Sequence, residues 1–252
     1  RFETPFQNKE GLDKRQQMLE GWGVKVTESF TEAVKGCDAI MLEINDPAFH
    51  LQYVRKAARL RKPLFIDKPL AATVKEGQKI LAILKKYNVR AMSCSSLRFA
   101  RELEDALQAI PRPEVGSFTG AYGKAPSGDS LIWYGVHVFE MLQRAMGRGA
   151  LSVRATESAA GVVAVVEYPE GREAVAEVRP YYHYCGQLLS KERPIQFICD
   201  GGKLYTNQLR KIVPFFQGAE PLVAMEDALE VMALMAAARK SVTRKGKPVA
   251  VQ

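Results

Sequence analysis

Apolar and polar residues follow two different periods in the first hundred positions of the chain. Short apolar runs typical of buried strands occupy Val24–Val26, Asp38–Ile44, Pro63–Asp67 and Val89–Cys94. Between these runs, apolar residues at helical spacing predict helices over Ser29–Val34, Pro47–Leu60 and Thr73–Tyr87. Strands that alternate with helices over short connections form a parallel sheet. We therefore predict an α/β domain with a parallel sheet over residues 1–97.

The pattern changes from about Arg98. Apolar periodicity predicts helices over Ala100–Leu107, Leu131–Gly147, Gln208–Gln217 and Met225–Val242. A Pro- and Gly-rich stretch, Pro111–Ser130, separates the first two of these helices. Strands are predicted over Gly161–Pro169 and Arg172–Tyr182, and a hairpin with Asp200-Gly201 at its turn over Ile195–Thr206. Clustered strands predict that residues 98–252 form an α+β domain with a largely antiparallel sheet.

Composition excludes several classes of protein. The chain has 252 residues, of which 47% are hydrophobic and 25% charged, and a net charge of +8. This balance is typical of a globular protein and favours anionic small ligands. No basic stripe with interleaved aromatic residues occurs, so nucleic acid is not expected as a partner. Neither a run of eighteen apolar residues nor a leader is visible, so we expect no membrane association.

The four cysteines are far apart and form no C-x-x-C pair. They lie in apolar runs, which is typical of reduced, buried thiols in a cytoplasmic protein. We therefore expect a cytoplasmic location and no metal site.

Polar residues follow three of the predicted parallel strands, at the sheet edge where α/β proteins bind ligands. Asn45 and His50 follow the second strand, Asp67 and Lys68 the third, and "SSLRF", Ser95–Phe99, the fourth. The alternatives are a packed polar helix residue for His50 and a salt bridge for the arginine of "SSLRF". A lysine held at an apolar strand end can polarise a carbonyl group or share a proton.

His137 lies in "WYGVHVFEML", at helical spacing from Trp133 and Glu140. A histidine in the core, or one that caps a helix, is the plain interpretation. The alternative is catalytic, because imidazole has the side-chain pKa nearest neutrality and suits proton exchange with a substrate hydroxyl. Glu140, one helical turn further on, is placed to orient the ring.

Together these motifs resemble a known family. The segment "DAIMLEINDPAFHLQYVRKAARLRKPLFIDKPLAATVKEGQKILAILKKYNVRAMSCSSLRF" strongly resembles the glucose-fructose oxidoreductase / inositol dehydrogenase / MocA (Gfo/Idh/MocA) family. The closing "FFQGAEPLVAMEDALEVMALMAAARKSVTRKGKPVAV" is similar to the family's C-terminal helix and tail. The resemblance implies a Rossmann-type sheet for residues 1–97 and a substrate-binding and oligomerisation domain for residues 98–252.

The resemblance implies roles for residues at the strand ends. Lys68 corresponds to the family's active-site lysine, and Asp67 stands where glutamate is commoner. Asn45, Pro47 and His50 fall in the loop that contacts the cofactor, with the family's proline displaced by one place. Ser96 and Arg98 fall at the strand end that faces the nicotinamide.

The resemblance also implies roles for one helix of the second domain. His137 matches the family's catalytic histidine, but Trp133 stands where the family usually has an aspartate. Trp133 and Tyr134 are expected at the substrate, and the Tyr134 hydroxyl is a candidate to replace the missing carboxylate.

The implied function is an NAD(P)-dependent oxidoreductase that transfers a hydride between nicotinamide and a sugar, polyol or related hydroxy compound. The resemblance also implies a homodimer or homotetramer. The alternative is a non-catalytic dinucleotide-binding regulatory or scaffold protein, suggested by the missing aspartate. The sequence does not decide between NAD and NADP.

No G-x-G-x-x-G phosphate loop occurs in the chain. Such a loop normally follows the first, central strand of a Rossmann sheet. We therefore expect a β-α-β segment of roughly thirty residues to precede Arg1. Arg1 would then lie just past the second strand of that segment.

Overall fold

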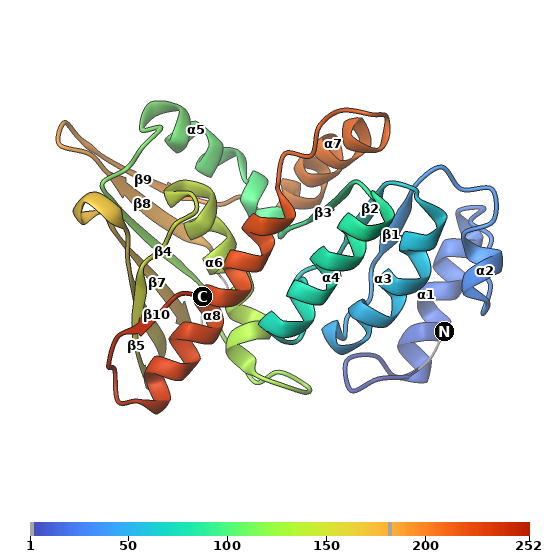
Figure 1. Cartoon of the computed structure of the whole chain (residues 1–252), viewed down its shortest axis with the longest axis horizontal. Coiled ribbons are helices and arrows are strands. Elements are labelled where there is room, and N and C mark those ends of the chain that lie inside the picture. The colour runs from blue at the N-terminus through green and yellow to red at the C-terminus, as the bar shows by residue number, and fades with distance from the viewer. Residues whose placement is uncertain (1–2, 181–182) are drawn as a thin grey trace.

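The computed structural model describes residues 3–180 and 183–252, and it places them in two adjoining sheets with their helices (Figure 1). Arg1 and the last two residues of the predicted strand Arg172–Tyr182 lie outside the described residues. The predicted combination of a parallel sheet and a largely antiparallel sheet is confirmed.

The first sheet has three parallel strands in the order β1-β2-β3. These strands are β1 (Ile40–Leu42), β2 (Leu64–Ile66) and β3 (Ala91–Ser93). They are joined by α3 (His50–Ala57), with a 3-10 turn at each end, and by α4 (Val74–Tyr87). The matching predictions from periodicity are confirmed, although the strands are shorter than predicted.

Both faces of this sheet are covered, which explains why every residue of β2 and β3 is buried and why β2 is apolar throughout. Leu64 and Ile66 point into the main core, whereas Phe65 belongs to a second cluster with residues of α7 (Leu204–Phe216). Alternate side chains of a strand point to opposite faces, so both faces need apolar residues. A helix from the C-terminal half of the chain therefore seals the first sheet.

The N-terminal part differs from the prediction. The structure has a helix that periodicity did not predict, α1 (Lys9–Gly21), and a single-turn helix α2 (Phe30–Ala33) whose N-cap is Ser29. The predicted strand at Val24–Val26 is wrong, because these residues are not in a strand. Val24 is 47% exposed and has no neighbouring strand among the described residues to pair with.

The second sheet has seven strands in the order β10-β5-β6-β7-β4-β8-β9. Their bounds are β4 (Val115–Ala121), β5 (Ser152–Ser158), β6 (Gly161–Glu167), β7 (Glu173–Arg179), β8 (Cys185–Leu189), β9 (Pro194–Ile198) and β10 (Val249–Ala250). Only the pair β4–β7 is parallel in this part of the described chain. Four of these strands were not predicted, β4 among them, because it lies inside a Pro- and Gly-rich stretch.

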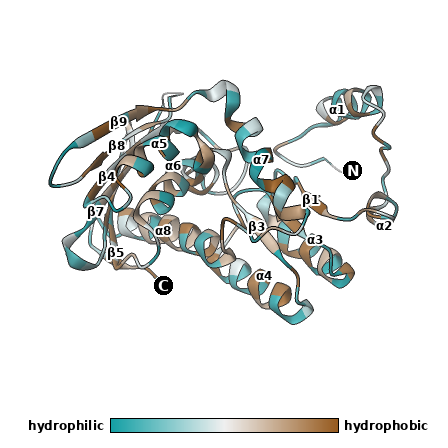
Figure 2. Ribbon diagram, turned by 90° about the horizontal axis from the view of Figure 1, so that it is seen from above, coloured by the Kyte–Doolittle hydropathy of each residue, from teal (hydrophilic) through white to brown (hydrophobic). Residues whose placement is uncertain are grey.

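Helices α5 (Arg101–Ala109), α6 (Ser130–Met146) and α8 (Met225–Thr243) pack on one side of this sheet (Figure 1). Helix α8 contacts α4 and β3 as well as α6 and β5, so it links the two sheets. Hydrophobic residues recur along α6 (Figure 2), and eleven of its 17 residues are buried. The long helix α6 is thereby held between the first sheet and the second.

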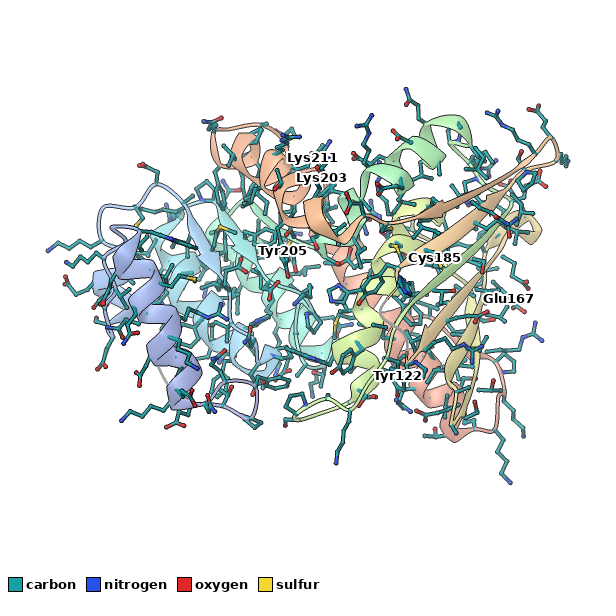
Figure 3. All side chains as sticks on the ribbon, turned by 180° about the vertical axis from the view of Figure 1, so that it is seen from behind. Tyr122, Glu167, Cys185, Lys203, Tyr205 and Lys211 are labelled. Carbon is teal, nitrogen blue, oxygen red and sulfur yellow. The ribbon has the colours of Figure 1, made fainter. Side chains whose placement is uncertain are left out.

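The predicted hairpin at Asp200-Gly201 is wrong. The Asp200 carboxylate accepts a hydrogen bond from Gly202 N at 2.9 Å and starts a 3-10 turn that leads into α7. A carboxylate that accepts a backbone N–H in this way is a helix cap, and the same dipeptide also favours tight hairpin turns. Helix α7, marked by Lys203, Tyr205 and Lys211 in Figure 3, lies above the junction of the two sheets.

Two kinds of feature are absent from residues 3–180 and 183–252. None of their helices is both long enough and apolar enough to cross a bilayer. They include no group of three or more His, Cys, Asp or Glu side chains that would hold a metal ion. All four cysteines are free thiols, but only Cys94 is fully buried.

Candidate active site

The candidate site lies where the parallel strands of the first sheet end against α6. The strands are paired in register, so that Leu42, Ile66 and Ser93 stand side by side at their last positions. The residues that follow must emerge at one edge of the sheet. The edge therefore combines the loop after β1, the Asp67-Lys68 dipeptide after β2 and the serines after β3.

Lys68 is held at this edge by a carboxylate and an aromatic ring. Its ammonium lies 3.3 Å from Asp67 Oδ2 and 5.6 Å from the centre of the Trp133 ring. The Lys68 side chain is 21% exposed, and the Lys68–Pro69 peptide bond is cis. The ring of Phe6 also packs against the Trp133 indole, with ring centres 4.3 Å apart. The indole that replaces the expected aspartate thus faces the lysine directly, as cation–π contacts require.

His137 is the second group that the structure brings to this edge. Its Nδ1 lies 2.7 Å from Ser95 Oγ, and the Tyr184 ring meets it edge-on at 5.7 Å. Burial, with the Lys68 charge as a second cause, lowers the pKa of His137 to about 3. The ring is therefore neutral at physiological pH and lies within the electrostatic reach of Lys68.

The predicted partners of His137 are not the observed ones. The hydroxyl that contacts the ring belongs to Ser95, whereas the Tyr134 ring packs edge-on against Tyr122 at 6.4 Å. Glu140 does not orient His137, because its carboxylate pairs with Arg98 at 3.0 Å. Both corrections have the same cause: the histidine faces the strand ends, while residues elsewhere around α6 face the core.

Arg98 lies in the core behind the site. Its guanidinium donates to Glu140 Oε2 and to Gln143 Oε1 on α6, and its side chain is 5% exposed. The salt bridge that the sequence analysis gave as the alternative for Arg98 is therefore present. The contact between Arg98 and a cofactor has no support in this geometry. Ser96, its neighbour in the same 3-10 turn, is 8% exposed.

His50 joins two of the loops that form the edge. Its ring nitrogens lie 2.8 Å from Ile44 O and 3.1 Å from Leu70 O, and the residue is fully buried. The first carbonyl belongs to the loop after β1 and the second to the loop after β2. His50 therefore positions the loops that carry Asn45 and Lys68, and it does not itself reach the open side of the site.

The loop after β1 starts with a local cap. Asp46 accepts a hydrogen bond from Ala48 N at 3.0 Å, and Pro47 occupies the first position of the 3-10 turn that follows. Proline fits there because the first turn leaves its N–H groups unused. Asn45 and Pro47 are half-buried at the edge, where the sequence placed them.

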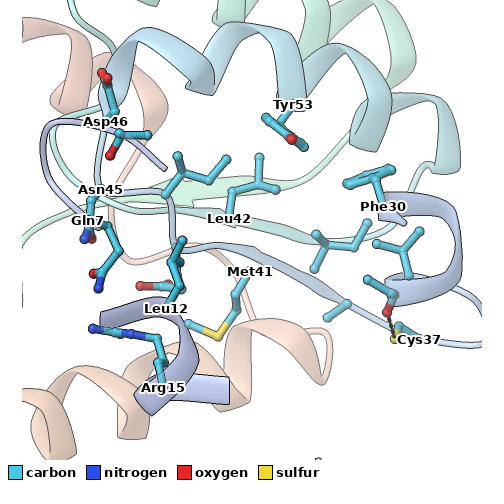
Figure 4. A pocket seen from close by; sticks show the side chains of 17 residues that line it. Gln7, Leu12, Arg15, Phe30, Cys37, Met41, Leu42, Asn45, Asp46 and Tyr53 are labelled. Atoms are coloured by element: carbon cyan, nitrogen blue, oxygen red, sulfur yellow. Dashed lines mark hydrogen bonds between the residues drawn. The ribbon is translucent and has the colours of Figure 1, made fainter. Parts of the chain in front are cut away.

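A cavity of about 500 Å³ runs along the outer side of β1 and ends at this loop (Figure 4). Asn45 and Asp46 lie at one end of it, Phe30 and Cys37 at the other, and Arg15 reaches across from α1. Its apolar walls with a cation and an amide fit a flat, partly anionic ligand such as a dinucleotide.

Two groups at the edge were missed in the sequence. Ser95 was passed over for Ser96, although a serine placed directly after a strand is as strong a signal. Glu43, which lines the cavity, has a pKa raised to about 7 by burial and by the Asp67 charge, while Lys68 lowers it. An acidic residue that continues a buried strand was the available signal for Glu43.

Residues 9–94 match the model of an oxidoreductase family with an NAD-binding Rossmann fold, GFO_IDH_MocA. This match confirms the family resemblance noted in the sequence and, at the level of the family, a nicotinamide dinucleotide as the cofactor. Among curated proteins, no match was found.

Several solved structures share the fold over nearly the whole chain. A probable dehydrogenase from Thermotoga maritima is 20% identical, with a TM-score of 0.84 over 95% of this chain and 88% of the other. The myo-inositol 2-dehydrogenase from Lactobacillus plantarum is 15% identical, with a TM-score of 0.80 over 97% and 89%. The WlbA dehydrogenase from Bordetella pertussis, solved with NADH and UDP-GlcNAcA, is 14% identical, with a TM-score of 0.78 over 97% and 88%.

Proposed function

Because residues 9–94 match the model of an oxidoreductase family with an NAD-binding Rossmann fold, we propose that the protein is an NAD(P)-dependent oxidoreductase of a sugar, polyol or related hydroxy compound. The observation that carries the proposal is the convergence of Lys68 and His137 at the end of the parallel sheet. The similarity to a myo-inositol 2-dehydrogenase and to a dehydrogenase solved with NADH and UDP-GlcNAcA supports this substrate class.

The residues present fit the nicotinamide end of the cofactor. Asn45 and the loop after β1 lie beside the cavity, and Arg15 supplies a positive charge along its length. The chain has no G-x-G-x-x-G loop for the pyrophosphate. When bound, the dinucleotide supplies the hydride acceptor or donor.

The protein's own groups handle the substrate oxygen. Lys68 carries a positive charge that stabilises negative charge as it develops on that oxygen. His137, held by Ser95 at 2.7 Å, presents its other ring nitrogen to the same region. Trp133 and Phe6 form an aromatic wall, on which the C–H face of a sugar or polyol can pack.

The seven-stranded sheet supports the predicted oligomer. Helices cover one face of this sheet, and no helix of the described chain covers the other (Figure 1). We propose that this second face makes the subunit contact of a homodimer or homotetramer, which light scattering coupled to gel filtration measures directly.

Turnover is the test of the function. Purified protein is titrated with NADH and NADPH, and then assayed with a panel of sugars and polyols and both oxidised cofactors. Lys68→Ala and His137→Ala should each lower kcat/KM by roughly 10²-fold or more, since each removes a group at the reacting oxygen. Lys85→Ala, which removes an exposed lysine of α4, is the matched control and should turn over normally.

Binding of a dinucleotide without turnover of any substrate would favour the scaffold alternative. The same conclusion would follow if substrates turned over and both site variants kept the wild-type rate.

A further inference from the structure

Ser95 holds its hydroxyl group between two fixed partners. Ser95 is fully buried, and its Oγ accepts a hydrogen bond from Leu97 N at 3.2 Å. The same oxygen lies 2.7 Å from His137 Nδ1. A side chain held in this way has no freedom to choose another partner.

The direction of the hydrogen bond between Ser95 and His137 determines which ring nitrogen of His137 carries the proton. If the Ser95 hydroxyl donates to His137, Nδ1 is bare and the ring proton is on Nε2. If Nδ1 carries the proton instead, Ser95 Oγ accepts it, and the serine proton then needs a third partner. Among the described residues, only Leu97 N and His137 lie within hydrogen-bond distance of this oxygen, and Leu97 N is a donor. A buried hydroxyl without an acceptor is unfavourable, so the first arrangement prevails.

We propose that Ser95 is a positioning residue that donates to His137 Nδ1 and so keeps the ring proton on Nε2, the nitrogen left open to a substrate. Its catalytic consequence rests on the proposed function. With its proton on Nε2, His137 donates a hydrogen bond to the substrate oxygen and cannot accept the hydroxyl proton there. This reverses the role expected from the sequence, in which His137 exchanges that proton.

Lys68 is then the group that carries the proton. In the oxidation of a hydroxy compound, the Lys68 ammonium first releases one proton to water. Its amine then takes the hydroxyl proton as the hydride leaves the carbon for the nicotinamide, and the ammonium is restored. In the reverse direction the Lys68 ammonium returns this proton to the oxygen while the hydride arrives at the carbon. His137 keeps its own proton throughout and stabilises charge on the oxygen.

The charges around His137 agree with a neutral ring. Lys68, which is paired with Asp67, acts on the ring from the loop after β2. Tyr184, whose ring meets His137 edge-on, lies in turn near Tyr134. Burial and the Lys68 charge keep the pKa low, so the imidazolium, in which both nitrogens would be donors, does not compete near pH 7. The pKa of Tyr184 is raised to about 12 by burial, so this phenol also stays neutral.

Nuclear magnetic resonance of the free protein tests the tautomer without any turnover. With 15N-labelled histidine, the ring nitrogens of His137 are assigned by their loss in His137→Gln. We expect a bare Nδ1 and a protonated Nε2 that do not change between pH 6 and 9. Ser95→Ala should turn this single tautomer into a mixture, and Ser95→Thr, which keeps the hydroxyl, should restore it.

Ser93→Ala is the matched control. Ser93 is also a buried serine of the same segment, but its hydroxyl has no hydrogen-bond partner in the described structure. Removal of that hydroxyl should leave the signals of His137 unchanged. A protonated Nδ1 in the wild type, or a Ser95→Ala variant with unaltered ring signals, would overturn the proposal even if the protein is an active oxidoreductase.

Kinetics test the division of roles once a substrate is known. Ser95→Ala should lower kcat by about 10–100-fold with little change in KM, as for other residues that orient a catalytic group. His137→Gln, whose amide still donates a hydrogen bond, should retain at least about tenfold more activity than His137→Leu. If both variants are equally inactive, and the pH dependence of kcat disappears in His137→Gln but not in Lys68→Ala, His137 moves the proton and the proposal fails.

Discussion

The buried ion pair between Arg98 and Glu140 gives the sharpest prediction about stability. It joins the turn after β3, which carries Ser95, to α6, which carries His137. The side chains are 5% and 3% exposed, and Arg98 Nη1 lies 3.0 Å from the Glu140 carboxylate. Removal of one partner from a buried pair leaves the other charge without compensation, which costs about 3–5 kcal/mol of unfolding free energy.

The surroundings place Glu140→Ala near the lower end of that range. Gln143 Oε1 still accepts from Arg98, and the Asp227 carboxylate lies 4.0 Å away. We therefore expect a loss of about 3 kcal/mol for Glu140→Ala, or roughly 6–12 °C in melting temperature for a chain of this size. Glu140→Gln keeps the shape and an acceptor oxygen, so it should cost only about 1 kcal/mol.

The pH dependence of the wild type has a definite sign. Burial raises the pKa of Glu140 above its usual value even though Arg98 lowers it. The folded state therefore binds a proton at a higher pH than the unfolded chain does, and the ionised carboxylate costs stability at neutral pH. This cost is relieved as the pH falls towards about 4.5, the pKa of the carboxyl in the unfolded chain. Between pH 7 and 5 the free energy of unfolding of the wild type should therefore rise relative to that of Glu140→Gln.

Urea unfolding followed by circular dichroism, together with melting curves, measures these differences. The control is Arg112→Ala, which breaks an exposed pair with Glu170 at 2.7 Å in which both side chains are 66% exposed. That variant should lose less than about 1 kcal/mol. If Glu140→Ala is no less stable than Arg112→Ala, or if Glu140→Gln costs as much as Glu140→Ala, the reasoning is refuted.

Three further predictions concern other parts of the molecule. Gly161→Ala should lower the free energy of unfolding in urea by about 2 kcal/mol or more, because φ at Gly161 is +112° and a Cβ there would meet a carbonyl of β7 at 2.0 Å. Gly21→Ala, at the end of α1, is the control and should be neutral or stabilising. His50→Ala should lower the melting temperature and weaken NADH binding together, because both loops of the site lose their bridge; a fall in melting temperature alone would argue against the positioning role. Cys94 should react with a thiol reagent only on unfolding, because it is fully buried and its pKa is raised, whereas the partly exposed Cys37 should react in the native protein.

Local sequence determined the parallel sheet and the residues at its edge. The apolar triplet of β2 can be buried only if both faces of the sheet are covered, and β2 is the central strand of the three. Lys68 follows β2 after the single residue Asp67, and its place at the strand end therefore follows from the order of residues alone. The helix that carries His137 was equally visible from its spacing.

Predictions from the local sequence were wrong wherever contacts with a distant part of the chain determine the secondary structure. Val24–Val26 has the composition of a strand, but a strand also needs a neighbour with which to pair. Asp200-Gly201 suits a hairpin turn and a helix cap equally well, and the packing of α7 on the first sheet selects the cap. In both places the same short sequence is compatible with two local structures.

The chemistry of the site was divided in the same way. The sequence identified Lys68 and His137 as candidate reactive groups, because residue type and distance from a strand end are local properties. Only the tertiary structure showed that Arg98 is buried in the core, that His50 connects two loops and that Ser95 hydrogen-bonds to the ring of His137. A hydrogen bond depends on atoms within about 3 Å, and Ser95 and His137 are 42 residues apart. The direction of each side chain is therefore fixed by packing between distant segments, which the order of residues does not reveal.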